Sequence, residues 1–172
     1  ARKRSDHYVT IGRQLPYKHY DLAVKAATKL NKKLIVFGNG PAHSQLVKLA
    51  GPTVEFRTDR FGDASDAEYE KAITTARGFI YPAEEDFGIV SVEALAAGAP
   101  VIGLARGGTT DIVTSPDIGT LFQHQTVDDI VKAVEIAEQT SFHPSKLART
   151  AKRFDKGLFL TKIKKVVYDK YH

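Results

Sequence analysis

The feature of this sequence that most constrains the fold is a repeated pattern of short apolar runs. Each run ends in a glycine or polar turn, and a helix-like segment follows it. Leu34–Phe37 is continuously apolar, as expected for a parallel strand covered by helices on both faces. Similar β-rich or apolar runs occupy residues 8–11, 54–56, 79–81, 100–104 and 120–122. Segments with helical spacing of apolar residues separate them. This alternation predicts an α/β, doubly wound parallel sheet of about six strands.

The 172 residues form one ordinary domain, because 42% hydrophobic and 26% charged residues are typical of a globular chain. The absence of cysteine excludes disulfides and thiolate metal sites, and it fits a cytoplasmic protein. No apolar run is long enough to span a membrane. The sequence contains no methionine, so we interpret the chain as a fragment or a processed product.

Basic residues concentrate at the end of the chain. Residues 144–172 hold nine Lys/Arg and two Asp/Glu, an excess of 9 − 2 = +7 within a net charge of +5. We predict a closing pair of basic helices near 144–154 and 158–171. These are either a solvated surface or a face for anionic lipid headgroups, which would place the protein at the inner face of a membrane. Nucleic acid is disfavoured, because Tyr168 and Tyr171 are the only aromatics near the densest lysines.

Four loops follow strand ends, and in a parallel sheet such loops open on one edge, where ligands bind. A further polar loop is predicted at 59–66. The four strand-end loops are Gly12-Arg13, Gly38-Asn39-Gly40-Pro41, Glu84-Glu85-Asp86-Phe87-Gly88 and Arg106-Gly107-Gly108.

The stretch from Tyr81 to Pro100 reads as strand end, acidic loop and a helix opening at about Gly88. Free N–H groups and the dipole at a helix start favour an anion. The carboxylates of Glu85 and Glu93 can accept hydrogen bonds from hydroxyls. A ligand with phosphate and many hydroxyls, such as a nucleotide sugar, suits this stretch; the alternative is a solvated acidic loop. Ile89, Val92 and Ala96 supply the apolar spacing of this predicted helix.

Arg13 and Lys18 are candidates for a diphosphate clamp, because hydrogen bonds from cations to phosphate are strong. The alternative is two surface cations. Pro16 is predicted near the first position of a helix that carries Lys18 on its first turn. The glycines at 38, 40, 107 and 108 either permit tight turns or let a ligand approach the backbone. The six histidines show no metal spacing, and no nucleophile–base pair stands out.

Together these motifs resemble family 4 glycosyltransferases, specifically the C-terminal, donor-binding half of their two-domain GT-B fold. The resemblance is carried by Gly12-Arg13-x4-Lys18, Gly38-x-Gly40-Pro41, Glu85-x7-Glu93 around Phe87-Gly88, and Arg106-Gly107-Gly108. PAEEDFGIVSVEA is most similar to mannosyltransferases of O-antigen and polysaccharide assembly. The resemblance covers roughly residues 8–159.

The resemblance implies roles for single residues. Arg13 and Lys18 would bind the donor diphosphate, Glu93 the ribose, and Glu85 would lie beside the transferred sugar as a catalytic residue with the two cations. The backbone N–H groups of Phe87, Gly88 and Ile89 would contact sugar or phosphate. The strand-end loops would complete the donor site through Gly12, Gly38, Gly40, Pro41, Gly107 and Gly108. Asp111 departs from the glutamate that often follows the paired glycines.

The resemblance also implies a retaining reaction that needs no metal or cofactor, with GDP-mannose or a UDP-hexose as donor. A sugar or lipid-linked acceptor would bind an N-terminal domain that this chain lacks, so the fragment alone is expected to be inactive. Two alternatives remain open. One is a nucleotide-sugar 2-epimerase of the same fold, which needs further carboxylates or a histidine in the cleft. The other is a non-catalytic nucleotide-binding module.

Overall fold

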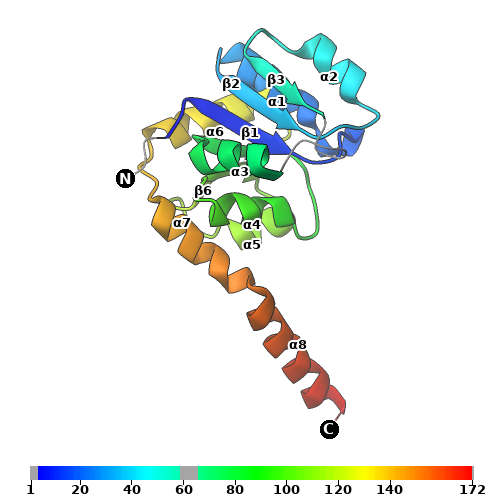
Figure 1. The fold of residues 1–172 in the computed structure, drawn as a ribbon, viewed down its shortest axis with the longest axis vertical. Coiled ribbons are helices and arrows are strands. Elements are labelled where there is room, and N and C mark those ends of the chain that lie inside the picture. The colour runs from blue at the N-terminus through cyan, green and yellow to red at the C-terminus, as the bar shows by residue number, and fades with distance from the viewer. Residues whose placement is uncertain (1–3, 59–65, 172) are drawn as a thin grey trace.

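Six parallel strands form one sheet in the order β3-β2-β1-β4-β5-β6 (Figure 1). The computed structural model describes residues 4–58 and 66–171, so most of the predicted polar loop at 59–66 lies outside the described residues. The doubly wound parallel sheet predicted from the apolar runs is confirmed. The strands are β1 (His7–Ile11), β2 (Lys33–Phe37), β3 (Val54–Arg57), β4 (Gly78–Tyr81), β5 (Val101–Leu104) and β6 (Gly119–Phe122).

Helices cover both faces of the sheet and enclose two apolar cores. One face carries α1 (Tyr20–Lys29), α2 (His43–Leu49) and α6 (Val127–Gln139). The other carries α3 (Asp66–Thr75), α4 (Ile89–Ala96), α5 (Gly108–Ile112) and α7 (Pro144–Ala151). Two short 3₁₀ helices, η1 (Pro16–Lys18) and η3 (Lys152–Phe154), and the long α8 (Lys156–Tyr171) complete the described elements. Because both faces are covered, every residue of β1, β4 and β5 is buried.

The segment after β1 differs from the single helix predicted from Pro16. Pro16 begins η1, which ends at Lys18, and His19 then adopts a left-handed conformation with φ of 53°. This residue interrupts the helical path, so α1 starts only at Tyr20. Lys18 therefore lies on a short 3₁₀ turn ahead of α1, and not on the first turn of α1.

Helix α4 is present as predicted. Its buried residues are Ser91, Ala94 and Leu95, whereas Ile89 is 61% exposed. Gly88 precedes the helix with φ of 77°, a left-handed conformation that sets the direction in which the first turn leaves the loop. The apolar spacing of Ile89, Val92 and Ala96 thus indicated the helix correctly, and of these three Val92 packs against the core.

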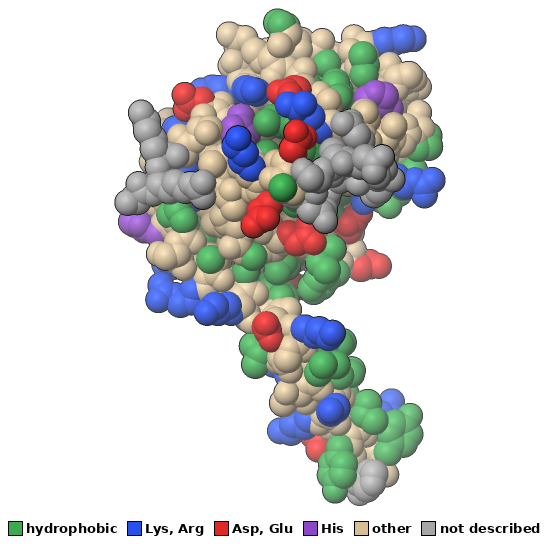
Figure 2. All heavy atoms as spheres, viewed as in Figure 1, with side chains coloured by type: hydrophobic (Ala, Val, Ile, Leu, Met, Phe, Trp, Pro, Cys, Tyr) green, Lys and Arg blue, Asp and Glu red, His purple; other side chains and the backbone are tan. Residues whose placement is uncertain are grey.

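The basic end of the chain forms α7, η3 and α8. Helix α8 projects away from the body of the molecule (Figure 1) and carries five lysines and one aspartate. Figure 2 shows apolar and lysine side chains interspersed along it. No helix in the described part of the chain is long and apolar enough to cross a membrane. The large apolar side chains of α8, between 41% and 75% exposed, are Leu158, Phe159, Leu160, Ile163, Val166, Val167, Tyr168 and Tyr171.

Candidate functional site

The predicted loops meet at the carboxyl edge of the sheet, beside the point where the strand order reverses between β1 and β4. Backbone hydrogen bonds tie the loop after β1 to the loop after β2, and the loop after β4 to the loop after β5. Open α/β sheets bind ligands at such a reversal. The bonds run from Gly12 N to Phe37 O (3.1 Å), from Gln14 N to Asn39 O (2.9 Å) and from Gly108 N to Glu85 O (2.8 Å).

The glycines of these loops make room for neighbouring backbone. A Cβ atom at Gly108 would lie 2.6 Å from the carbonyl oxygen of Asp86, and one at Gly107 would collide with the carbonyl oxygen of Glu85. A Cβ at Gly40 would lie 2.6 Å from the carbonyl oxygen of Gln14. Close packing of loop against loop therefore accounts for these three glycines, and it is neither the tight turn nor the approach of a ligand that the sequence analysis offered.

Glu85 lies at the centre of a polar cluster between β1 and β4. Its Oε1 is 2.8 Å from Nζ of Lys18, and its Oε2 accepts a hydrogen bond from the hydroxyl of Tyr81. The side chains of Lys18 and Glu85 are only 16% and 25% exposed. Burial raises the pKa of the Glu85 carboxyl, but the hydrogen bonds from Lys18 and Tyr81 outweigh it and hold that pKa below its ordinary value. The carboxylate is therefore charged and fixed in place.

Two tyrosines support this cluster, and the sequence analysis identified neither. Tyr81 ends β4, and burial together with the adjacent Glu85 carboxylate raises its pKa. Tyr20 donates a hydrogen bond of 2.6 Å to the carbonyl oxygen of Ile11. Gly12, with φ of 145°, lies against Tyr20, whose hydroxyl occupies the place of a Cβ. Tyrosines in buried strands and helices look like ordinary core residues in a sequence, so nothing there marked their hydroxyls.

Arg13 has a different environment from Lys18. It is exposed and lines a cavity of about 390 Å³ with Asn39, Gly40 and Pro41. The structure records no ion pair for Arg13 with another described residue. The adjacent Gln14 is fully buried and fixes this loop, because its Nε2 donates to the carbonyl oxygen of Gly38 at 2.7 Å. Its Oε1 lies 2.8 Å from Nδ1 of His43.

A second cavity, of about 490 Å³, lies along the acidic loop. It includes the N-terminus of α4, where amides without intrahelical partners and the helix dipole favour negative charge. Glu85 contributes to its wall, so the cavity offers a ligand both backbone amides and a carboxylate. The lining residues are Tyr17, Glu84, Glu85, Asp86, Phe87, Gly88 and Ile89.

Glu93 is exposed on α4. It is not among the described residues that line either cavity. The structure thus brings together Lys18, Glu85 and the start of α4, and separately Arg13 with the Gly40-Pro41 turn. It does not place Glu93 in contact with these groups.

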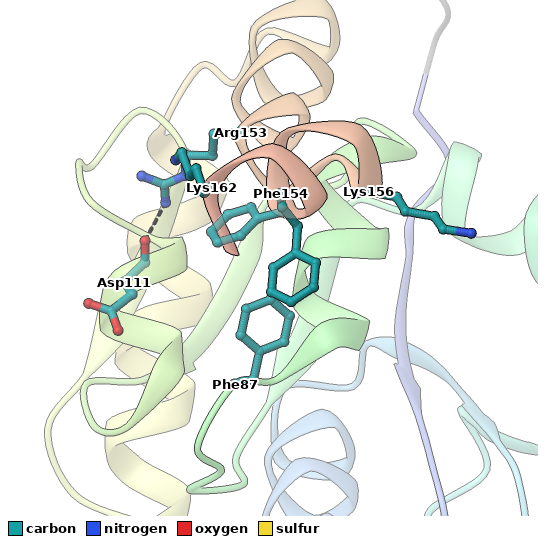
Figure 3. A pocket seen from close by; sticks show the side chains of 7 residues that line it. Phe87, Asp111, Arg153, Phe154, Lys156 and Lys162 are labelled. Carbon is teal, nitrogen blue, oxygen red and sulfur yellow. Dashed lines mark hydrogen bonds between the residues drawn. The ribbon is translucent and has the colours of Figure 1, made fainter. Parts of the chain in front are cut away.

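A larger groove of about 660 Å³ also has Phe87 in its wall (Figure 3). Phe87 and Phe154 meet edge to face, with ring centroids 5.7 Å apart. Arg153 anchors η3 to α5 by donating to the backbone oxygens of Asp111 and Ile112, the latter at 2.8 Å. Asp111 itself is exposed at the rim. The sequence analysis did not predict that the basic C-terminal segment would flank the acidic loop.

Across residues 4–58 and 66–171, no three histidine, aspartate or glutamate side chains are grouped to hold a metal ion.

Comparison with known families decides the assignment. The model of the family described as glycosyl transferases group 1 matches residues 1–154. The chain belongs to this family. The matched region includes all six strands and every candidate site residue, and it ends at η3, before α8.

Curated relatives agree with this assignment. The chain is 32% identical over 130 residues to a GDP-mannose-dependent alpha-mannosyltransferase of Mycobacterium tuberculosis (strain CDC 1551 / Oshkosh). It is 31% identical over 135 residues to a D-inositol 3-phosphate glycosyltransferase of Mycobacterium marinum (strain ATCC BAA-535 / M). These alignments cover 72% and 73% of this chain but only 33% and 28% of the relatives. The chain therefore spans about a third of the length of such enzymes.

Solved structures share the fold. The pneumococcal O-GlcNAc transferase GtfA, solved with UDP and GlcNAc, superposes with a TM-score of 0.76 over 99% of this chain and 37% of that protein, at 21% identity. AviGT4, a glycosyltransferase of avilamycin A biosynthesis, gives a TM-score of 0.75 over 98% of this chain and 52% of its own, at 17% identity. The six-stranded sheet is thus the Rossmann-like half of a GT-B fold.

Proposed function

We propose that this chain is the donor-binding domain of a retaining glycosyltransferase. The observation that carries the proposal is the Lys18–Glu85 pair beside the N-terminus of α4, with Arg13 lining a separate cavity at the same carboxyl edge of the sheet. Two cations and a helix start suit a diphosphate, and a fixed carboxylate suits sugar hydroxyls. In hexosyl transfer the two cations would stabilise the departing nucleoside diphosphate, which is electrostatic catalysis.

GDP-mannose is the first donor to test, because the mannosyltransferase at 32% identity is named for it. A UDP-hexose is the second, since relatives at similar identity carry other glycosyltransferase names. The experiment is calorimetric titration of the 172-residue chain with GDP, UDP and ADP and with their hexose conjugates. Preferential binding of one nucleoside diphosphate supports the proposal and identifies the base. Failure of every nucleotide to bind would refute it.

We expect the chain to bind donor and to transfer no sugar alone. Its cavities account for phosphate and donor sugar, while the relatives devote about two thirds of their length to other segments. Transfer needs donor and acceptor held in register, and such positioning can supply about 7–11 kcal/mol of the barrier. The assay presents GDP-mannose, UDP-glucose and simple or lipid-linked sugar acceptors, as used in polysaccharide assembly. Robust glycoside formation by this chain alone would contradict the half-enzyme interpretation.

For α8 we propose contact with an anionic membrane surface, which would hold the domain at the inner face of the cytoplasmic membrane. Five lysines against one aspartate and a row of exposed apolar side chains support this. Co-sedimentation with vesicles containing phosphatidylserine, compared with neutral vesicles, tests it. Equal binding to both, or none to either, would contradict the proposal.

A further inference from the structure

The two side chains proposed to grip the diphosphate are in unlike states. Arg13 is exposed at the mouth of its cavity. Lys18 is largely buried and is already paired with Glu85 at 2.8 Å. A diphosphate can engage Arg13 directly, whereas Lys18 must first leave a carboxylate. One half of the proposed clamp is thus occupied by another residue of the same site.

The two groups that hold Glu85 differ in stiffness. Tyr81 is the last residue of the central strand β4 and is fully buried, and its ring stacks on Phe79 with centroids 5.8 Å apart. Its hydroxyl is therefore a fixed donor. Lys18 ends the short η1 turn and reaches Glu85 through a flexible stem. If Lys18 moved, Tyr81 would still hold one oxygen of Glu85 in place.

We propose that the Lys18–Glu85 ion pair is a latch that the donor diphosphate opens, and that Tyr81 is the positioning residue that keeps Glu85 in place afterwards. The inference rests on the proposed function. Lys18 transfers from the carboxylate to phosphate, and the Glu85 oxygen it leaves becomes available to a hydroxyl of the donor sugar. Diphosphate capture and sugar recognition are thereby coupled through one lysine.

The latch predicts that loss of a charged side chain from the site increases the affinity for one kind of ligand. A nucleoside diphosphate without sugar must break the ion pair and gains nothing from the oxygen that is released. Removing the charge of Glu85 should therefore strengthen its binding. We expect Glu85→Gln to tighten GDP or UDP binding by about two- to tenfold, because the diphosphate no longer has to break a partly exposed ion pair.

Two controls isolate the lysine. Glu84→Gln removes the same charge from the same loop, but Glu84 faces Arg106 at 3.8 Å, so it should change affinity much less. On a Lys18→Met background, Glu85→Gln should lose most of its effect, because only general repulsion of the phosphate remains. An unchanged effect on that background would show that the lysine is not involved and would overturn the latch.

Tyr81→Phe tests the positioning role. It removes one hydroxyl and retains the ring, so the fold should persist. We expect GDP and UDP binding to stay within about twofold, and binding of the matching nucleotide hexose to weaken by about two- to tenfold, as for loss of one hydrogen bond. A merely structural role would weaken both ligands equally, and that result would overturn the assignment.

A measurement without nucleotide makes the inference independent of donor identity. Carboxyl NMR titration of the full chain should find the pKa of Glu85 below its ordinary value and raised by Lys18→Met and by Tyr81→Phe. It should also rise in the wild type when pyrophosphate is added. If the pKa of Glu85 is ordinary and neither substitution changes it, the latch is wrong, whereas the proposed function is unaffected. If neither pyrophosphate nor any nucleotide binds, the proposed function fails, and the latch, having nothing to open it, fails with it.

Discussion

Arg13 is exposed to solvent beside the Gly40-Pro41 turn, so its contribution to the affinity for a ligand can be measured separately. Arg13→Ala should weaken nucleoside diphosphate binding by about 10- to 150-fold, as expected for one hydrogen bond to a charged group. Binding of the nucleoside alone should change little. Calorimetry with GDP and guanosine, or UDP and uridine, makes the comparison.

The matched control is Arg106→Ala, because Arg106 is also exposed on a strand-end loop but faces Glu84 at 3.8 Å. It should alter affinity several-fold less than Arg13→Ala. If both nucleoside and diphosphate lose affinity equally in Arg13→Ala, the phosphate assignment is wrong.

The role of Glu93 in binding the ribose remains a prediction from the resemblance, since Glu93 is exposed on α4 and lies outside both cavities. If it binds the ribose, Glu93→Ala should weaken nucleoside diphosphate and nucleotide sugar alike, by about 10- to 150-fold for a charged hydrogen bond. The variant should also bind ribose and 2′,3′-dideoxyribose nucleotides equally. A retained preference for ribose would remove Glu93 from the site.

At the scale of elements, the close contact between the loops after β4 and β5 depends on Gly108. A Cβ there would approach the carbonyl oxygen of Asp86 to 2.6 Å, and its N–H donates to the carbonyl oxygen of Glu85. Gly108→Ala should lower the free energy of unfolding by about 1–3 kcal/mol through overpacking. It should also displace the acidic loop and weaken nucleotide binding. Urea denaturation and calorimetry measure the two effects.

Gly157→Ala is the control for a glycine-to-alanine change, because a Cβ at Gly157 meets only the carboxylate tip of Asp155, at 3.0 Å. Its effect on stability should stay within about 1 kcal/mol, the range of the helix propensity difference. Equal destabilisation by both substitutions would show that loop contact is not the cause.

Helix α6 begins with a side-chain cap. Thr126 accepts a hydrogen bond of 3.2 Å from the backbone N–H of Asp129. Thr126→Ala should reduce the free energy of unfolding by about 0.5–2 kcal/mol, as for other lost caps. Thr150→Ala serves as comparison, since Thr150 bonds within α7 to the carbonyl oxygen of Lys146 and alanine suits a helix. Denaturant unfolding should find Thr150→Ala neutral or stabilising.

The sequence predicted the elements better than the contacts between them. Apolar strands and helical spacing are local patterns, so the six parallel strands and the four site loops followed from them. The left-handed turn at His19 did not, because a positive φ is uncommon for any residue other than glycine and no local pattern in the sequence marked this position. The partnership of Tyr81 with Glu85 was missed because a tyrosine at a strand end is chemically indistinguishable from a core aromatic until its hydroxyl is placed.

For the whole molecule, α8 should be dispensable for folding. Its side chains are exposed throughout, and the family match ends at residue 154. A chain of residues 1–155 retains the hydrogen bond from Arg153 to α5 and the ring contact between Phe154 and Phe87. We expect its melting temperature and nucleotide affinity to match those of the full chain, as measured by calorimetry. A marked loss of stability would show that α8 folds back on the domain.

The strand order divides the site between two halves of the chain. Arg13 and Lys18 follow β1, whereas Glu85 and the start of α4 follow β4, and the halves meet through the pairs Tyr8–Gly78 and Val9–Phe79. Under the proposed function, phosphate binding and sugar recognition thus fall to two different segments of the chain. Recombination between two family members, in the segment that joins β3 to β4, should therefore produce chimaeras with the hexose preference of the parent that supplies the second segment. An ancestral gene assembled in this way could acquire a new sugar without rebuilding its hold on the leaving group.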